Sequence, residues 1–275
     1  MSRHLLLSLF VFSVIASPLQ AAEPLRVVGS TTVLPIVAEA AKQYRQLNPG
    51  LTLTVSGGGS GVGVSAVQQG TAEIGMLSRA VTAQEQQRLG AGFKVVAVAR
   101  DAVAVAISKV VFEGGVTQLS IAQIAAIYRG EIKNWQEVGG PDARILVIDK
   151  EPSRGTRHVF AKVVLGDEQA RAPGATIISG SNNEEQAAIA ASNQAIGMLS
   201  NAWLNDAVRA VAVGEPGKAV LPTLEHVADG SYPIQRELTI LLPRNAGKQV
   251  EGFVEFLLSD AGQRIVEQVG YLRAR

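Results

Sequence analysis

Short runs of β-branched and apolar residues alternate with amphipathic helical patterns through most of this chain. Residues 25–29, "LRVVG", have the composition of a strand, and apolar residues then recur at helical spacing from Val33 to Tyr44. "LTLTVSG" and "AEIGMLS" repeat the strand pattern on either side of a short helix that Gly70 ends. This order predicts an α/β protein with mixed sheets and helices on both faces.

Two further features indicate that the chain forms two lobes. "FKVVAVARDAVAVAIS", residues 93–108, is a strand pattern long enough to connect two lobes. The strings "EIGMLSR" (73–79) and "AIGMLSN" (195–201) are nearly the same, as expected of two α/β lobes of similar build. A chain of 275 residues is long enough for one large domain or two small ones.

The amino terminus has the residue order of a secretory signal peptide. Arg3 and His4 precede the apolar residues 5–16, and small residues follow at Ala21 and Ala22. The apolar core is short for a membrane span. We predict a signal peptide over residues 1–22, cleaved after Ala21 or Ala22, and a bacterial periplasmic location.

Charge and cysteine content exclude several kinds of partner. Lys and Arg total 25 against 24 Asp and Glu, so there is no overall field that would attract nucleic acid or an anionic membrane. With no cysteine the chain has neither a disulfide framework nor a lipidated cysteine, and we expect no membrane anchor. Any anion must therefore be recognised locally.

Hydroxyl residues and glycines concentrate at three places where a predicted strand passes into a predicted helix. The start of a helix that follows a strand offers unpaired backbone N–H groups, and small residues let an anion approach them. Ser and Thr hydroxyls add donors without adding charge. Taken singly, each cluster could also be a helix cap or a turn. The residues concerned are Ser30, Thr31 and Thr32; Gly59, Ser60 and Gly61; and Gly155 and Thr156.

Two arginines accompany these clusters. Arg79 follows Ser78 at the end of a predicted strand, and Arg154 lies in the turn "SRGTR". A guanidinium can hold a tetrahedral oxyanion with two parallel hydrogen bonds, although each residue could equally be a solvated surface arginine. Arg157 is expected to point outward from its helix.

Catalytic signatures are scarce. Outside the predicted signal the histidines are His158 and His226, and the sequence has no HExxH or GxSxG motif. We therefore expect no catalytic residue, no bound metal and no cofactor. A secreted phosphoester hydrolase that uses Ser60 or Ser78 is the competing hypothesis from another class, but it lacks a placed base and metal ligands.

Five strings resemble, in order, the phosphate-binding proteins of bacterial phosphate ABC transporters: "GSTTVLPIV", "SGGGSGVGVSAVQQGTAEIGMLSRAVT", "GTR", "AIGMLS" and "DGSYPIQREL". The resemblance covers essentially the whole mature chain. It implies a type II periplasmic binding fold, with two α/β lobes joined by two crossing strands. Residues 24–105 plus 233–275 would form lobe 1, and residues 106–232 would form lobe 2.

The resemblance also implies where the ligand binds, in a cleft between the lobes. This chain departs from the family at three positions. Arg154 replaces a common serine, Lys150 occupies the position of a binding arginine, and Arg79 lacks the neighbouring acid that some members have. Asp149 or Glu151 could supply a proton acceptor instead. The implied ligand-binding residues are Ser30, Thr31, Thr32, Ser60, Ser78, Arg79, Arg154, Gly155 and Thr156.

The function that this resemblance implies is capture of inorganic phosphate and its delivery to the membrane permease of an ABC transporter. Binding would close the cleft by a hinge motion, and we expect the protein to be a monomer. The alternatives are a binding protein for another oxyanion, such as sulfate, molybdate, tungstate or arsenate, or an anion-sensing or adhesion protein on the same fold.

Overall fold

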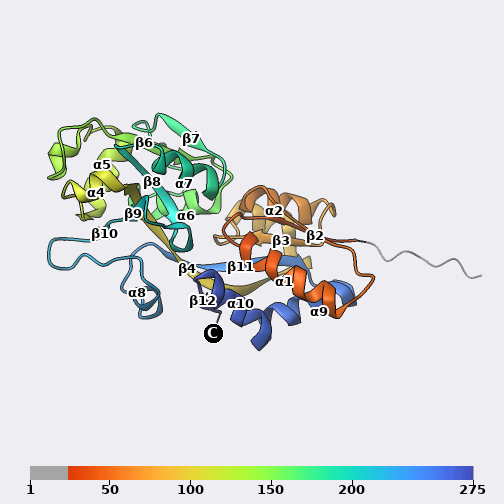
Figure 1. Cartoon of the computed structure of the whole chain (residues 1–275). Coiled ribbons are helices and arrows are strands. Elements are labelled where there is room, and N and C mark those ends of the chain that lie inside the picture. The colour runs from red at the N-terminus through yellow and green to blue at the C-terminus, as the bar shows by residue number, and fades with distance from the viewer. Residues whose placement is uncertain (1–23, 275) are drawn as a thin grey trace, which may run out of the picture.

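Strand β4 (Phe93–Ser108) runs through the middle of the molecule and pairs with strands on both sides of it. The computed structural model describes residues 24–274, so the predicted signal peptide lies outside the described residues. One curled sheet has the strand order β2-β1-β3-β11-β4-β8-β6-β7, and β9 and β12 also pair with β4. Figure 1 shows β4 and β11 passing between two groups of helices and strands. The predicted mixed α/β architecture is confirmed.

The strands have the following bounds: β1 Leu25–Gly29, β2 Leu53–Gly57, β3 Ile74–Leu77, β5 Gln118–Leu119, β6 Leu146–Lys150, β7 Ile177–Ser179, β8 Ala195–Ser200, β9 Val208–Ala210, β10 Ala212–Val213, β11 Gln235–Pro243 and β12 Leu272–Arg273. The α-helices are α1 Leu34–Leu47, α2 Ser60–Gln68, α3 Ala83–Leu89, α4 Lys109–Glu113, α5 Ile121–Arg129, α6 Gly155–Val164, α7 Asn182–Ala190, α8 Leu224–Ala228, α9 Lys248–Leu258 and α10 Asp260–Val269.

Two groups of elements, called here the first and second halves, lie on either side of the crossing strands. In the first half β1 pairs in parallel with β2 and β3, and β11 runs antiparallel to β3. Helices α1, α2, α9 and α10 belong to this half (Figure 1). In the second half β6 pairs in parallel with β7 and β8, and β8 runs antiparallel to β4. Helices α4 to α7 belong to this half (Figure 1).

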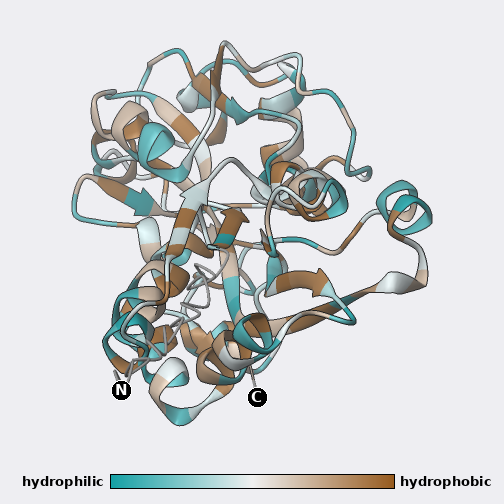
Figure 2. Cartoon of the chain, turned by 90° about the vertical axis from the view of Figure 1, so that its right-hand side faces the viewer, coloured by the Kyte–Doolittle hydropathy of each residue, from teal (hydrophilic) through white to brown (hydrophobic). Residues whose placement is uncertain are grey.

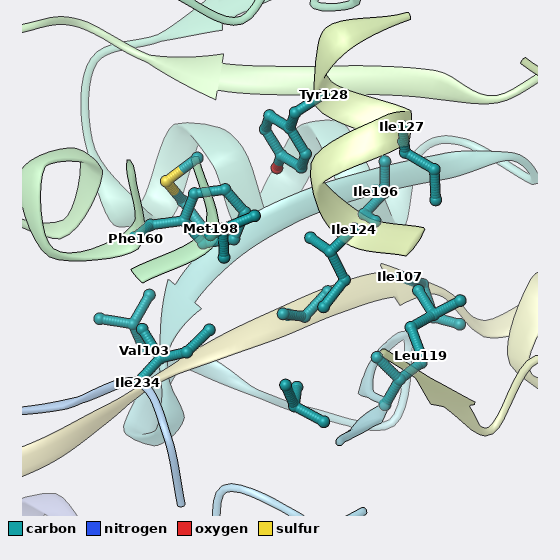
Figure 3. Close-up of a cluster of buried hydrophobic side chains, with 14 of the residues drawn as sticks. Val103, Ile107, Leu119, Ile124, Ile127, Tyr128, Phe160, Ile196, Met198 and Ile234 are labelled. Atoms are coloured by element: carbon teal, nitrogen blue, oxygen red, sulfur yellow. The ribbon is translucent and has the colours of Figure 1, made fainter. Parts of the chain in front are cut away.

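Each half has its own apolar core. The first-half core includes Leu25, Met76 and Phe253, and the second-half core includes Tyr128, Trp135 and Phe160. In the second half the rings of Tyr128 and Phe160 lie 4.7 Å apart between α5 and α6, with Met198 of β8 beside them (Figure 3). In Figure 2 the strands inside the molecule are largely apolar, and the helices outside them are of mixed polarity. These cores fix the helices that carry the loops described below.

Several helix ends match the sequence signals. The Ser120 hydroxyl caps α5 in a capping box with Gln123, and Gly130 ends that helix with φ 76°. Ser259 separates α9 from α10 by capping α10. At α7 the cap is Ser181, whose hydroxyl accepts from the Glu184 N–H.

One residue orientation was predicted wrongly. Arg157 does not point outward: it is 7% exposed, and its guanidinium bonds to both carboxylate oxygens of Asp149 at 3.2–3.3 Å. The third residue of α6 faces the end of β6, where Asp149 can neutralise it. Trp135 is fully buried, as expected of a core residue, and Trp203 is partly buried against an apolar cluster.

Within residues 24–274, no helix combines the length and the apolar character needed to cross a membrane.

Candidate functional site

A small cavity of about 10 Å³ lies where the starts of four helices from the two halves meet. Helices α1 and α2 contribute from the first half, and α6 and α7 from the second half. Strand ends at β3 and β6 complete the wall. The lining residues are Ser30, Thr31, Thr32, Gly59, Ser78, Lys150, Arg154, Gly155, Thr156, Gly180 and Asn182.

The geometry of helix starts makes this cavity attractive to anions. The first N–H groups of each helix have no carbonyl of their own helix to bond, and the helix dipole places partial positive charge there. Gly155 and Thr156 are the first two residues of α6, and Asn182 is the first residue of α7. Their backbone donors therefore converge on the same space as those that precede α1.

The hydroxyl groups at the cavity accept hydrogen bonds from the protein itself. Ser30 Oγ accepts from the Thr32 N–H at 3.2 Å. Behind the wall, Ser60 Oγ accepts from the Ser78 N–H at 3.0 Å and lies 3.4 Å from Ser78 Oγ. A hydroxyl that accepts an N–H in this way keeps its own proton for another acceptor. Ser30 and Ser60 therefore each keep a hydroxyl proton that can be donated to another acceptor.

Thr32 and Thr156 face one another across the two halves, with their Oγ1 atoms 3.4 Å apart. Thr32 Oγ1 accepts from Asn182 Nδ2 at 2.9 Å, and Thr156 Oγ1 accepts from Arg236 Nη1 at 3.0 Å. All four side chains are at least nine-tenths buried. Arg236 of β11 thus donates to Thr156 of α6, and Asn182 of α7 donates to Thr32 in the loop before α1.

The cations near the cavity are each paired with a carboxylate outside it. Arg236 Nε and Nη2 bond to the two oxygens of Asp101 at 2.7 and 2.9 Å, and Asp101 is fully buried. Lys150 lines the cavity, and its Nζ forms an ion pair with Glu185. Burial raises the pKa of Glu185 above its ordinary value, against the lowering effect of Lys150. A carboxylate that meets each cation leaves little net charge at the site, so neutral donors carry much of its anion-binding capacity.

Arg154 lies along the wall between the halves. Its Nε and Nη2 bond to Glu151 Oε2 at 2.8 and 2.6 Å, and its side chain is 15% exposed. A Cβ at Gly59 would lie 2.9 Å from Arg154 Cδ, and the φ of Gly59 is +95°. Only glycine fits both the space and the backbone conformation at this point. The absence of a side chain at Gly59 in the first half therefore leaves room for the Arg154 side chain of the second half.

Gly155 lies in close contact with the first half. A Cβ on this residue would lie 2.5 Å from Ser78 Oγ and still nearer to Ser60 Oγ. The φ of Gly155 is not in the left-handed region, so the need for glycine is one of space. The start of α6 therefore seats directly on the serines of the first half.

Arg79 lies outside this cavity. Its guanidinium bonds to both oxygens of Glu85 at 2.7 Å, and it borders two other grooves. Burial alone would raise the pKa of Glu85, but the hydrogen bonds from Arg79 and from the Thr82 N–H outweigh it and hold the pKa below its ordinary value. This pair anchors the start of α3, because Glu85 is also the third residue of the helix and forms a capping box with Thr82.

The cavity thus gathers most residues that the sequence predicted. Ser30, Thr31, Thr32, Ser78, Arg154, Gly155 and Thr156 line it, Ser60 stands behind the wall, and Arg79 is elsewhere. Among the described residues, the cavity has no carboxylate in its lining, since Asp149 bonds to Arg157 and Glu151 to Arg154.

Sequence reasoning did not identify Asn182 and Arg236. Asn182 lies at a predicted helix start, and Arg236 belongs to "DGSYPIQREL", one of the strings that carry the family resemblance. The signal available in the sequence was a pair of opposite charges, Asp101 and Arg236, in or next to two predicted strands.

The histidines have structural partners. His158 Nε2 lies 2.7 Å from the Pro152 carbonyl oxygen, and His226 Nδ1 lies 2.9 Å from that of Leu221. Burial and the charge of Arg79 lower the pKa of His158. In residues 24–274 there is no group of three or more His, Cys, Asp or Glu side chains that could hold a metal ion.

Comparison with known proteins shows to which family the chain is similar. The family model described as a PBP superfamily domain matches residues 16–261. The phosphate-binding protein PstS of Bacillus subtilis is 32% identical over 255 residues, which cover 92% of this chain and 81% of that protein.

Solved structures show the same relationship. The crystal structure of a phosphate ABC transporter substrate-binding protein with bound phosphate, from Clostridium perfringens, is 30% identical, has a TM-score of 0.84 and is matched over 92% of this chain and 100% of that chain. An ABC-type phosphate transport receptor from Vibrio cholerae is 29% identical, has a TM-score of 0.73, and is matched over 90% and 99% of the two chains.

These similarities confirm the predicted two-lobed type II periplasmic binding protein fold, and the family is one of binding proteins and not of enzymes. Sequence and structure together place this chain in the PBP superfamily, within the family of PstS phosphate-binding proteins.

Proposed function

We propose that this chain captures inorganic phosphate in the cavity between its halves and delivers it to the permease of an ABC transporter. The observation that carries the proposal is the convergence of hydroxyl and helix-start N–H donors from both halves on one small space. Phosphate is tetrahedral and rich in acceptor oxygens, so donors arriving from several sides can each meet one. The bound phosphate of the Clostridium perfringens relative supports the choice of ligand.

The lobes that perform this capture are residues 24–105 plus 233–275 and residues 106–232. The two separate apolar cores support a division a few residues from these bounds, because one core draws on residues up to Ala99 and from Leu238 onward, and the other on residues between Ala102 and Ile234. Strands β4 and β11 are the crossing segments, and small changes along them would open and close the cavity.

The same proposal covers the setting of the protein. Residues 1–22 direct export, and the mature chain acts as a monomer in the periplasm. The ligand-binding residues are the predicted set without Arg79, which lies outside the cavity, and with Asn182 and Arg236 added as supporting groups. A docking surface for the permease would form when the two lobes come together around the anion.

A second candidate is a receptor for a fully deprotonated oxyanion such as sulfate, molybdate or tungstate. The absence of a carboxylate from the described lining favours it, since hydrogen phosphate carries a proton that needs an acceptor. The two candidates differ in ligand and share the same site.

Calorimetry of the purified protein, freed of bound ligand, tests the proposal. Phosphate, arsenate, sulfate, molybdate and tungstate are titrated into the wild type, into Thr156→Val and into the exposed control Thr54→Val. We expect tight phosphate binding that falls at least about tenfold in Thr156→Val, because a hydrogen bond to a charged ligand is lost, and that is unchanged in Thr54→Val. Absence of binding to every oxyanion would reject the proposal, and preference for sulfate or molybdate would select the second candidate.

A further inference from the structure

The two threonines that face each other across the cavity have their hydrogen bonds arranged by residues of other elements. A threonine hydroxyl offers one proton and two lone pairs. Asn182 Nδ2 occupies a lone pair of Thr32 Oγ1 at 2.9 Å, and Arg236 Nη1 occupies one of Thr156 Oγ1 at 3.0 Å. The proton of each hydroxyl must then point toward some other acceptor.

Hydrogen bonds hold the guanidinium of Arg236 in one orientation. Two of its nitrogens are held by Asp101 on the neighbouring strand, in direct register with Arg236. The remaining nitrogen, Nη1, donates both to Thr156 Oγ1 and to the Ser78 carbonyl oxygen at 3.0 Å. The guanidinium is thus a fixed donor, because four of its five N–H groups already have acceptors in the protein.

Asn182 is fixed in a different way. The start of α7 is capped by Ser181, so the helix does not need the Asn182 side chain as a cap. Asn182 is 1% exposed, and its amide reaches Thr32, 150 residues away in the chain. The backbone of Thr32 is held in turn, since its carbonyl oxygen accepts from the Tyr271 hydroxyl at 3.1 Å.

We infer that Asn182 and Arg236 are positioning residues that turn the hydroxyl protons of Thr32 and Thr156 into the cavity, and that they thereby set its preference for acceptor oxygens over ligand hydroxyls. The two threonines lie 3.4 Å apart, a long distance for a hydrogen bond between hydroxyls, so a bound anion is the better acceptor for their protons. The inference rests on the proposed function, since it requires an oxyanion in this cavity.

The substitution Asn182→Asp tests the inference with almost no change of shape. An aspartate accepts where the asparagine donated, so the Thr32 hydroxyl would donate to it and present a lone pair to the ligand. The site would then gain an acceptor for a proton of phosphate and lose a donor for sulfate. The neighbouring Asn183 is exposed, and Asn183→Asp adds the same charge to the same helix turn without contact to Thr32.

Phosphate and sulfate are titrated into the wild type and both variants across the second ionisation of phosphate. In Asn182→Asp, relative to Asn183→Asp, we expect sulfate affinity to fall at least tenfold more than phosphate affinity. The phosphate optimum should also move to lower pH, where the more protonated anion prevails. Asn182→Ala, which removes the donor without adding charge, should shift selectivity in the same direction by a smaller factor, and it decides the matter if Asn182→Asp does not fold.

The outcomes separate the two claims. A wild type that binds neither phosphate nor sulfate would overturn the proposed function. A wild type that binds, with the same selectivity and the same pH profile in Asn182→Asp and Asn183→Asp and no shift in Asn182→Ala, would overturn only the inference that Asn182 directs the Thr32 proton.

Discussion

At the scale of single residues, the cavity depends on one missing side chain as much as on the donors that line it. Gly155 opens α6 where Ser60 Oγ and Ser78 Oγ of the first half approach it. Any Cβ there would occupy the space of a serine hydroxyl, so α6 would have to withdraw from the first half. The donors of the second half would then reach the anion over a longer distance.

We predict that Gly155→Ala weakens phosphate binding at least about tenfold, the cost of at least one hydrogen bond to a charged group. Stability should also fall, by roughly 1–3 kcal/mol, because the added Cβ overlaps two buried serine hydroxyls. Calorimetry and thermal unfolding measure the two quantities. Gly92→Ala is the matched control, because a Cβ there meets nothing within 4 Å. Unchanged affinity in Gly155→Ala would contradict the close seating of α6.

Sequence reasoning found the residues whose type and local setting mark them. Ser30, Thr32 and Thr156 stand out as hydroxyls at strand-to-helix loops, and the structure places all three at the cavity. Asn182 and Arg236 carry no such local mark, because their partners lie 150 and 80 residues away. Their roles depend on which strands and helices come together, which a single sequence does not specify.

At the scale of elements, caps and strand lengths were predictable because they depend on neighbouring residues. Ser120 and Gly130 bound α5, and residues 93–108 form β4, as their local patterns indicate. Arg157 was predicted wrongly because its partner, Asp149, ends a strand that only the tertiary fold brings beneath α6. Arg79 was predicted to bind the anion, but its guanidinium pairs with Glu85, six residues later in the chain.

Helix α3 should gain pH-dependent stability from the Arg79–Glu85 pair. The folded-state pKa of Glu85 is lowered from its ordinary value of 4.5, so the stabilisation is fully present above pH 4.5 and is lost as the pH falls through the folded-state pKa. We predict that Glu85→Gln lowers the free energy of unfolding by roughly 2 kcal/mol at pH 7. The difference from the wild type should shrink as the pH falls well below 4.5.

Urea unfolding at pH 7 and at low pH measures this effect. Glu113→Gln is the control, since Glu113 belongs to an exposed pair at 3.6 Å and should change stability by less than about 1 kcal/mol. Phosphate affinity should be nearly unchanged in Glu85→Gln. A large loss of affinity together with unchanged stability would instead show that this pair serves the anion.

At the scale of the whole molecule, the two cores are joined by crossing strands and meet again at the cavity. Gly61 N donates to the Ser153 carbonyl oxygen at 3.1 Å, a direct backbone contact between the halves. A Cβ at Gly61 would lie 3.4 Å from Ser153 Cβ, near the spacing of disulfide-linked residues. The two halves are therefore in direct contact at this point, and the contact can be trapped by a disulfide.

Because the chain has no cysteine, the double variant Gly61→Cys with Ser153→Cys would contain a single possible disulfide. We predict that phosphate speeds its formation, since the anion favours the closed form. The oxidised protein should release and take up phosphate more slowly, and reduction should restore wild-type exchange. Oxidation rates that are equal with and without phosphate, measured by mass spectrometry, would argue against ligand-linked closure.

The central claim is that an oxyanion binds among Thr32, Thr156 and the helix starts around them. Arsenate has the shape and charge of phosphate, and its arsenic atom can be located by anomalous X-ray scattering from crystals grown with it. We predict one arsenic peak in this cavity, within hydrogen-bonding reach of Thr32 Oγ1 and Thr156 Oγ1. A peak beside Arg79 and Arg88 in the neighbouring groove, or no ordered arsenic at all, would contradict the account.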